Sequence, residues 1–198
     1  VEDLTLDATA FPNAATLQTD DAIGRLKVTS KLGDTDNDGE FEALYVYGAR
    51  SFSIWDAEDG TLVFDSGDQF EQITAQRYGS NFNNDNGEHD PDGRSDAKGP
   101  EPEAITVGEI DGKHYAFIGL ERMGGIMVYD ITTPSAPIFV NYVNDRDLTQ
   151  DPAEVGAAAG DLGPEGFKFV SASDSSNGKP LLIVGNEVSG TTSVYEIK

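Results

Sequence analysis

The sequence predicts an all-β fold, organised as a partial β-propeller of about three four-stranded antiparallel blades. The first observation is that 22 Gly and 9 Pro separate short apolar runs, which is typical of strands joined by turns. The second is the scarcity of helix signals, which predict only short helical turns within 14–23 and 152–159. The third is an internal repeat of strand-rich units.

Apolar runs of strand length follow one another along the chain. Runs of β-branched and aromatic residues bounded by Gly, Pro, Asn or Asp favour strands. The expected strands are 26–30, 43–47, 51–55, 61–64, 104–107, 115–120, 125–129, 139–143, 166–170, 181–184 and 192–197.

The repeat is clearest in the second half of the chain. One copy reads Pro-Glu-Ala-Ile-Thr-Val at 102–107 and Gly-Gly-Ile-Met-Val-Tyr-Asp at 124–130. The other reads Pro-Glu-Gly-Phe-Lys-Phe at 164–169 and Gly-Thr-Thr-Ser-Val-Tyr-Glu at 190–196. A weaker copy lies upstream, at 25–56. Strand-rich units that recur along a chain, as from residue 102 to residue 164 here, indicate propeller blades.

We therefore expect one blade in each repeating unit, over 24–75, 100–145 and 162–198. A blade cannot bury both faces of its sheet alone, so blades stack on one another around an axis. Propellers close with ~4–8 blades. We therefore expect that remaining blades, or another copy of the chain, complete the partial propeller that these three blades form.

The segment 78–99 differs from the rest, because it is almost without apolar residues. Its Asn- and Asp-rich sequence predicts a long polar loop. Loops of this length are usually functional or mobile, and the alternative is a solvated surface insertion. His89 lies in this loop and His114 in a hairpin, and neither has a second His at ligand spacing. Both are interpreted as surface residues.

The sharpest motif is the acidic run Asp-Thr-Asp-Asn-Asp-Gly-Glu-Phe-Glu at 34–42. Carboxylates at positions 1, 3 and 5 converge on one side of a tight loop, and Gly39 at position 6 allows the turn. Position 12 of an EF-hand would be Tyr45, which is no ligand, so the run is interpreted as the shorter nine-residue calcium loop between two strands. The expected metal-ligating residues are Asp34, Asp36, Asp38, Glu40 (through its carbonyl) and Glu42.

Ca²⁺ is therefore the predicted cofactor, because it takes 6–8 oxygen ligands. Carboxylates packed this densely repel one another strongly without a cation. The alternative is an acidic turn that binds no metal. A structural role is favoured over a catalytic one, because the loop uses up its own ligands.

A second set of acids recurs at the ends of the repeated strands. Glu103 matches Glu165, and Glu121 matches Glu187. Positions that repeat by blade lie at equal radius, so these four could line a central channel and hold a cation, with Glu101 adding to them. The alternative is that each accepts hydrogen bonds from a neighbouring blade. Candidate anion contacts at similar strand ends are Arg50 and Arg122.

Composition excludes several classes of protein. The 36 acidic and 13 basic residues give a net charge of −23, which repels nucleic acid. The absence of Cys excludes disulfides and thiolate metal sites. No apolar stretch approaches the ~18–20 residues that span a bilayer. The acidity fits cation binding, and a saline or marine habitat is an explanation that needs no function.

Several motifs together resemble one family. They are the runs at 32–45, 48–56, 99–103, 117–122, 161–166 and 185–192. These runs resemble the choice-of-anchor I proteins, which are bacterial, often marine, secreted or surface propeller proteins. The resemblance implies a propeller fold, of which this chain is the C-terminal part, and an extracellular, cell-surface or periplasmic location. Some members are described as alkaline phosphatase-like or cell-surface glycoprotein-like, and the resemblance carries over no catalytic residues.

Three functions remain open from the sequence. The first is a calcium-binding surface or secreted module that serves adhesion, scaffolding or capture of a surface ligand. The second is a calcium-dependent phosphoesterase that uses the repeated Glu residues, as in phosphatase- or phytase-like propellers. The third is a self-assembling structural subunit, because a partial propeller exposes blade edges. No hydrolase or NTPase motif is present.

Overall fold

A computed structural model describes residues 1–48 and 50–198, which form two compact units. The first unit comprises residues 1–48 and 95–99, and the second comprises residues 50–94 and 100–198. No helix in the described residues is long and apolar enough to cross a membrane.

Turns make up most of the first unit, which contains one short helix, α1 (Ala14–Leu17). Its ladder contacts are single bridges, Leu6 to Phe41 and Val28 to Val46. The segment 95–99 joins this unit through Asp96, whose carbonyl accepts a 2.7 Å hydrogen bond from the Lys27 amide. The ammonium of Lys27 also lies 3.5 Å from the Asp96 carboxylate.

The strands predicted at 26–30 and 43–47 are wrong, because pairing there is reduced to the Val28–Val46 bridge. Tyr45, Val46 and Tyr47 are all about half-exposed, so no apolar layer covers this segment. A two-stranded hairpin without a covered face is marginal in water, which explains why the apolar run does not extend into a ladder.

Three antiparallel sheets make up the second unit, which confirms a mostly β fold. The first sheet pairs β1 (Ser53–Trp55) with β2 (Leu62–Asp65). The second is a four-stranded meander of β3 (Pro102–Ile110), β4 (Lys113–Leu120), β5 (Ile126–Asp130) and β6 (Ile138–Val143). The third contains β7 (Pro164–Val170), β8 (Leu181–Asn186) and β9 (Thr191–Glu196). The described sheets do not close into a ring.

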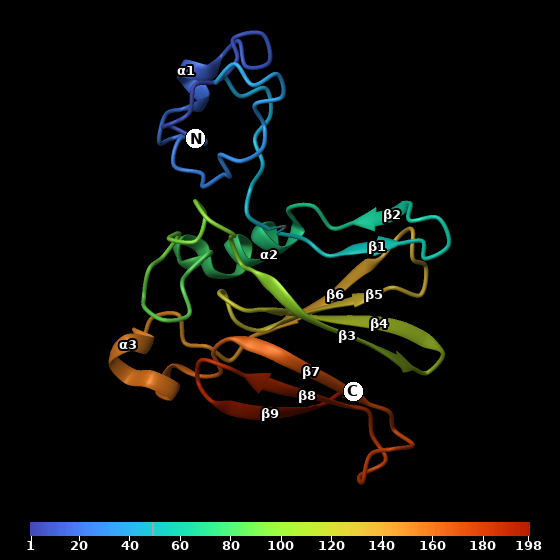
Figure 1. The fold of residues 1–198 in the computed structure, drawn as a ribbon. Helices are drawn as coiled ribbons and strands as arrows, with labels where there is room; N and C mark the ends of the chain where they lie inside the picture. The colour runs from blue at the N-terminus through green and yellow to red at the C-terminus, as the bar shows by residue number, and fades with distance from the viewer. Residues whose placement is uncertain (49) are drawn as a thin grey trace. The chain divides into compact units, whose positions relative to one another are not determined.

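Figure 1 shows these sheets stacked in chain order, with the β3–β6 sheet in the middle. Two apolar clusters hold the stack together. The first joins β1, β2 and the helix α2 (Gln69–Tyr78) to one face of β4 and β5, around the fully buried Tyr129 and Phe70. The second joins the other face to β7–β9, where Phe117 packs with Leu182 and Val184.

Two glycines allow the close approach of the second and third sheets. A Cβ on Gly108 would lie 2.5 Å from the Phe169 ring, and one on Gly119 would lie 2.8 Å from the ring of Phe167. Phe169 instead stacks on Phe117 with ring centroids 6.0 Å apart. The spacing of the two sheets therefore depends on these residues having no side chain.

The ten-residue helix α2 (Gln69–Tyr78) was not expected. Its Phe70, Ile73 and Tyr78 contact the first apolar cluster, and their spacing is close to that of one helical face. The helical turns predicted within 152–159 are confirmed as α3 (Pro152–Val155) and the 3₁₀ helix η2 (Gly156–Ala159), and a second 3₁₀ helix, η1 (Gly79–Asn81), follows α2.

The repeat is structural as well as sequential. In both sheets the first strand is irregular next to its opening Pro, with the register shifting between Pro102 and Ala104 and between Pro164 and Gly166. Glu103 and Glu165 are therefore the extra residues of two matching β-bulges. A bulge changes the direction of a side chain, and here it does so at the same place in each sheet.

Candidate functional site

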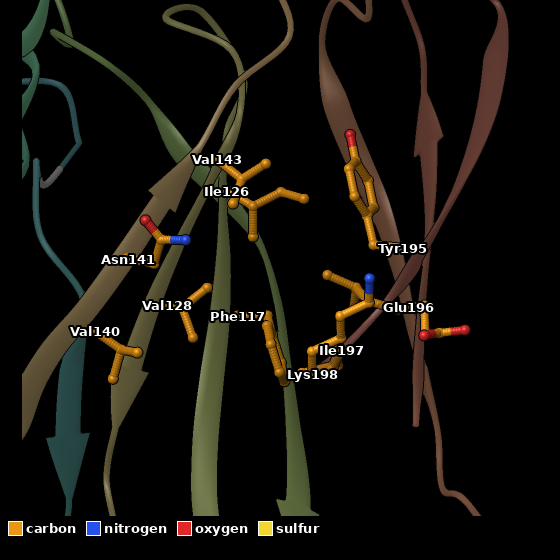
Figure 2. Close-up of a pocket in the computed structure, with 11 residues that line it drawn as sticks. Phe117, Ile126, Val128, Val140, Asn141, Val143, Tyr195, Glu196, Ile197 and Lys198 are labelled. Atoms are coloured by element: carbon orange, nitrogen blue, oxygen red, sulfur yellow. The ribbon is translucent and has the colours of Figure 1, made fainter. Parts of the chain in front are cut away.

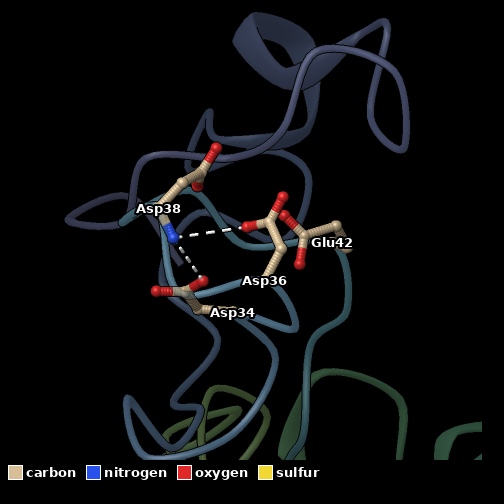
Figure 3. Close-up of side chains that lie close together, drawn as sticks. All are labelled: Asp34, Asp36, Asp38 and Glu42. Atoms are coloured by element: carbon tan, nitrogen blue, oxygen red, sulfur yellow. Dashed lines mark hydrogen bonds between the residues drawn. The ribbon is translucent and has the colours of Figure 1, made fainter.

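Carboxylates at 34–42 gather as the motif predicts. One oxygen from each of Asp34, Asp36, Asp38 and Glu42 lies within 4.8 Å of the others (Figure 3). The loop turns through Gly39, whose φ of +96° favours glycine. Its backbone amides bind the acids: the Asp38 amide lies 3.2 Å from an Asp34 oxygen, and the Gly39 amide lies 3.1 Å from the other.

Glu42 closes the loop from its far end. Its carboxylate accepts hydrogen bonds from the amide and hydroxyl of Thr35, at 2.6 and 2.7 Å. These bonds lower the pKa of Glu42, so it is ionised at neutral pH. The Glu40 amide donates to Asp38 over 2.8 Å, and the Glu40 side chain is not part of the cluster. The site is thus a set of hard oxygen donors, which suits Ca²⁺.

A second carboxylate cluster lies in the other unit, at the ends of β3 and β4. Oxygens of Glu101, Glu103 and Glu121 lie within 4.8 Å of one another. Glu101 and Glu121 are buried, whereas Glu103 is exposed. Burial raises the pKa of Glu121; Arg122 opposes that shift, and the charges of Glu103 and Glu101 add to it.

Arginines neutralise part of this cluster. The guanidinium of Arg94 contacts Glu101, and Arg122 lies 3.4 Å from Glu101 and 3.3 Å from Glu121. Asn86, itself buried, accepts a 2.6 Å hydrogen bond from Arg122 and donates to the Glu121 carbonyl over 3.2 Å. A buried carboxylate needs such partners because desolvation of an ion is costly.

Glu165 and Glu187 form the matching pair of the third sheet. A hydrogen bond with Glu187 is the largest cause of the raised pKa of Glu165, followed by the Glu187 charge; burial and the charge of Glu103 contribute less. The two acids line a surface hollow of about 280 Å³. The charge of Glu103 thus acts on one acid of each sheet, Glu121 and Glu165.

The ion pair that the structure describes for Arg50 is not with the repeated Glu residues. Its guanidinium lies 2.6 Å from Glu71 of α2, and the same Glu71 oxygen accepts a 2.6 Å hydrogen bond from Asn83. His89 and His114 are exposed, as expected.

The polar side chains that support the second cluster were not predicted from the sequence. Asn83, Asn84 and Asn86 are completely or almost completely buried, so this part of the polar segment is no solvated insertion. Arg146, 5% exposed, donates a 2.7 Å hydrogen bond to the Arg122 carbonyl and a second bond to the Asp85 carbonyl. Burial lowers its pKa to about 10, so it stays charged at neutral pH. Polar composition alone hides such residues, because it does not distinguish an Asn that binds water from one that binds backbone.

The backbone position just before the first strand of each repeat copy, which is Glu101 in the first copy, has different surroundings in the two copies. We call this position and its side-chain neighbour the corner of the copy. The Glu121 amide donates to the Glu101 carbonyl, and the Glu187 amide donates to the Gly163 carbonyl in the same way. Glu101 and Gly163 both have positive φ, +52° and +69°. Arg122, the partner of Glu101, is replaced in the second copy by Val188, whose side chain lies beside Gly163. An ion pair in one copy thus corresponds to an apolar contact in the other.

The family model of the choice-of-anchor I domain matches residues 1–134. The chain belongs to the choice-of-anchor I family. The matched residues include the 34–42 loop and the Glu101, Glu103 and Glu121 cluster.

This choice-of-anchor I chain is similar to two named proteins. Gigasin-3a of Magallana gigas is 29% identical over 191 residues, which are 92% of this chain and 67% of the relative. The mesenchyme-specific cell surface glycoprotein of Strongylocentrotus purpuratus is 25% identical over 122 residues, which are 54% of this chain and 16% of the relative. No solved structure matches.

Mutation can convert the Glu101–Arg122 corner of the first copy into the Gly163–Val188 corner of the second. Arg122→Val alone removes one of the cations that Glu101 contacts and should lower the free energy of unfolding by about 1–3 kcal/mol. Glu101→Gly combined with Arg122→Val recreates the Gly163–Val188 corner and should recover at least about 1 kcal/mol of that loss. Urea unfolding of the parent, both single variants and the double variant measures this coupling. Simple additivity would contradict it.

The Glu165–Glu187 pair should make stability depend on pH. Folding raises the pKa of Glu165 above 4.5, so the stability that this group adds is present below pH 4.5 and is lost as the pH rises through the raised value. Glu165→Gln removes the charge and should raise the melting temperature over the parent more at about pH 7 than at about pH 4. Thermal melts in EDTA measure this, with the exposed Glu109→Gln as control. An equal difference at both pH values would refute the pairing.

Proposed function

We propose that the chain is a calcium-binding module of a surface or secreted protein, folded as part of a β-propeller, and that it serves adhesion, scaffolding or ligand capture. The observation that carries the proposal is the convergence of Asp34, Asp36, Asp38 and Glu42 within 4.8 Å. None of the ion pairs in the described part of the chain includes these acids, so their repulsion calls for a cation.

Three further observations support the architecture, the location and the binding of cations. Successive antiparallel sheets stack face to face in chain order, with matching bulges, as adjacent blades do. The Strongylocentrotus purpuratus relative is named as a cell surface glycoprotein, and we extend that location to this chain. The net charge of −23 suits a surface that binds cations in a saline medium.

Calcium removal should destabilise the protein. Binding to the folded state alone stabilises it by about 2.7 kcal/mol when free Ca²⁺ is 100 times Kd. EDTA should therefore lower the melting temperature, and Asp36→Ala should abolish most of that difference. Asp20→Ala, an exposed acid of the same unit, is the matched control.

Metal content gives the decisive readout. Mass spectrometry after dialysis without added metal should find about one Ca²⁺ per chain in the parent and in Asp20→Ala, and none in Asp36→Ala. A parent chain without calcium, and with a melting curve unchanged by EDTA, would refute calcium binding at 34–42.

A second candidate function, calcium-dependent phosphoester hydrolysis, is favoured by the convergence of Glu101, Glu103 and Glu121 beside Arg122. Metal ions held by carboxylates can activate water, and an arginine can bind phosphate. If this is the function, the chain should hydrolyse p-nitrophenyl phosphate with Ca²⁺, and Glu103→Gln should reduce the rate at least about tenfold. Glu109→Gln is the control. No hydrolysis above the buffer blank leaves the binding module as the function.

A further inference from the structure

The chain contains two Asn-Gly pairs, at 86–87 and at 177–178. Asparagine is chemically labile, and most of all before glycine, because glycine has no side chain to keep its own nitrogen away from the asparagine side chain. The structure gives the two pairs opposite surroundings. Asn86 is 1% exposed, whereas Asn177 is exposed on the loop that joins β7 to β8.

The reaction at such a pair is the loss of the asparagine side-chain amide. The glycine nitrogen attacks the side-chain carbonyl carbon, Cγ, and the new N–C bond closes a succinimide ring. The bond from Cγ to Nδ2 breaks, and the amide nitrogen leaves as ammonia with the proton of the glycine N–H. Water then opens the ring at either carbonyl and gives aspartate or isoaspartate. Water is the co-reactant, and nothing is oxidised or reduced.

The loop folds the Asn177 side chain toward the peptide bond with which it reacts. Its Oδ1 accepts a 3.1 Å hydrogen bond from the Lys179 amide. The ring that this bond closes contains the Gly178 nitrogen, so the side-chain carbonyl lies over the Asn177–Gly178 peptide as in an Asx turn. Gly178 has a φ of +71°, and a Cβ on it would meet nothing within 4 Å, so the nitrogen is approachable.

Hydrogen-bond donors lie where negative charge develops in this reaction. Attack on Cγ turns Oδ1 of Asn177 into an oxyanion, which donors already in place stabilise. The Ser175 hydroxyl donates to this oxygen over 3.1 Å, and the Lys179 amide is shared between it and the Ser175 oxygen, 2.9 Å away. The leaving nitrogen, Nδ2, donates to Glu196 over 3.4 Å, which is long for a hydrogen bond.

The two attacking nitrogens also differ. The Gly178 N–H donates to the Ser175 carbonyl over 3.3 Å. The Gly87 N–H donates over 2.8 Å to the carboxylate of Asp85. Attack requires the nitrogen to lose its proton, and a neighbouring negative charge opposes that loss. The Gly178 nitrogen is therefore the easier one to activate.

Tertiary contacts hold the Asn86 side chain in place. Its Oδ1 accepts a 2.6 Å hydrogen bond from Arg122, and its Nδ2 donates to the Glu121 carbonyl over 3.2 Å. The side chain cannot turn onto Gly87 without breaking these bonds. Its burial also keeps away the water that opens the ring.

We propose that Asn177 is a modification site of the folded protein, at which the side-chain amide is lost spontaneously to give aspartate and isoaspartate, while Asn86 is protected. This inference goes beyond the proposed function and does not depend on Ca²⁺.

The product adds one negative charge to the loop and leaves the apolar interface intact. Glu196 already binds the Lys179 ammonium over 2.9 Å. Figure 2 shows that the Glu196 side chain extends from β9 away from Phe117 and Ile197, which line the apolar hollow between the second and third sheets. The new carboxylate at 177 therefore competes for Lys179 on the solvent side of β9, and the modified chain stays folded.

The test incubates the 198-residue chain at neutral and at mildly alkaline pH and maps its proteolytic peptides over time by mass spectrometry. Conversion of amide to acid at Asn177 should increase with time and should be faster at the higher pH, because attack needs a deprotonated nitrogen. Conversion at Asn86 should be at least about tenfold slower, because a buried residue reacts only after local opening. In urea-unfolded chain, the matched control, the two residues should react at similar rates.

Two variants test the role of the loop. Ser175→Ala removes the hydroxyl donor and should slow conversion of Asn177 at least about twofold in the folded chain. Ser175→Thr keeps a hydroxyl and should restore the rate of the parent. In urea both variants should react as the parent does, since the loop geometry is then lost.

Two results would overturn the proposal. One is an Asn177 that stays unmodified in the folded chain while the urea-unfolded chain reacts. The other is an equal rate at Asn86 and Asn177 in the folded chain. A rate that Ser175→Ala leaves unchanged would overturn the role of the hydroxyl. Incubation in Ca²⁺ and in EDTA should give the same rate at Asn177, which keeps this test separate from the calcium proposal.

Discussion

Burial of the β3–β6 sheet on both faces is the constraint on which the second unit depends. On one side Tyr129 and Met127 lie in the cluster with Phe52 and Phe70. On the other, Phe117 packs against β7 and β8, which approach closely because residues 108 and 119 are glycines. This packing fixes where the strands end. Because the second and third sheets have the same bulge, the fixed ends bring acids of these two sheets to neighbouring positions.

Electrostatics sets the second requirement. The chain carries −23, yet three of its six arginines lie around the buried acids. Arg94 and Arg122 meet Glu101, and Arg146 holds the backbone at Asp85 and Arg122. The 34–42 loop has backbone amides and Thr35 in place of such cations. One acidic cluster is thus balanced by arginines of the chain, and we propose that a cation from solvent balances the other.

Sequence reasoning succeeded where the signal was local and repeated. The strands from β1 to β9, the equivalence of Glu103 with Glu165, and the gathering of the 34–42 acids all follow from patterns of a few residues. It failed where tertiary packing decides. The apolar face of α2 is recognisable only once the cluster that includes Phe70 is known. The run at 43–47 has no apolar layer to cover it. The burial of Asn83 and Asn86 follows from partners far along the chain. The propeller and the calcium remain predictions.

The matching bulges also bear on how such a chain can grow. Each copy of the unit contains the bulge and therefore an acid at the same end of its first strand. Each duplication of the unit thus adds negative charge at that edge of the stacked sheets. The first copy offsets this charge with Arg122, whereas the second has Val188 there, and has Gly163 in place of the additional Glu101. In the two copies present, these two positions therefore differ together: an acid and a cation stand in one copy, and no side-chain charge stands in the other.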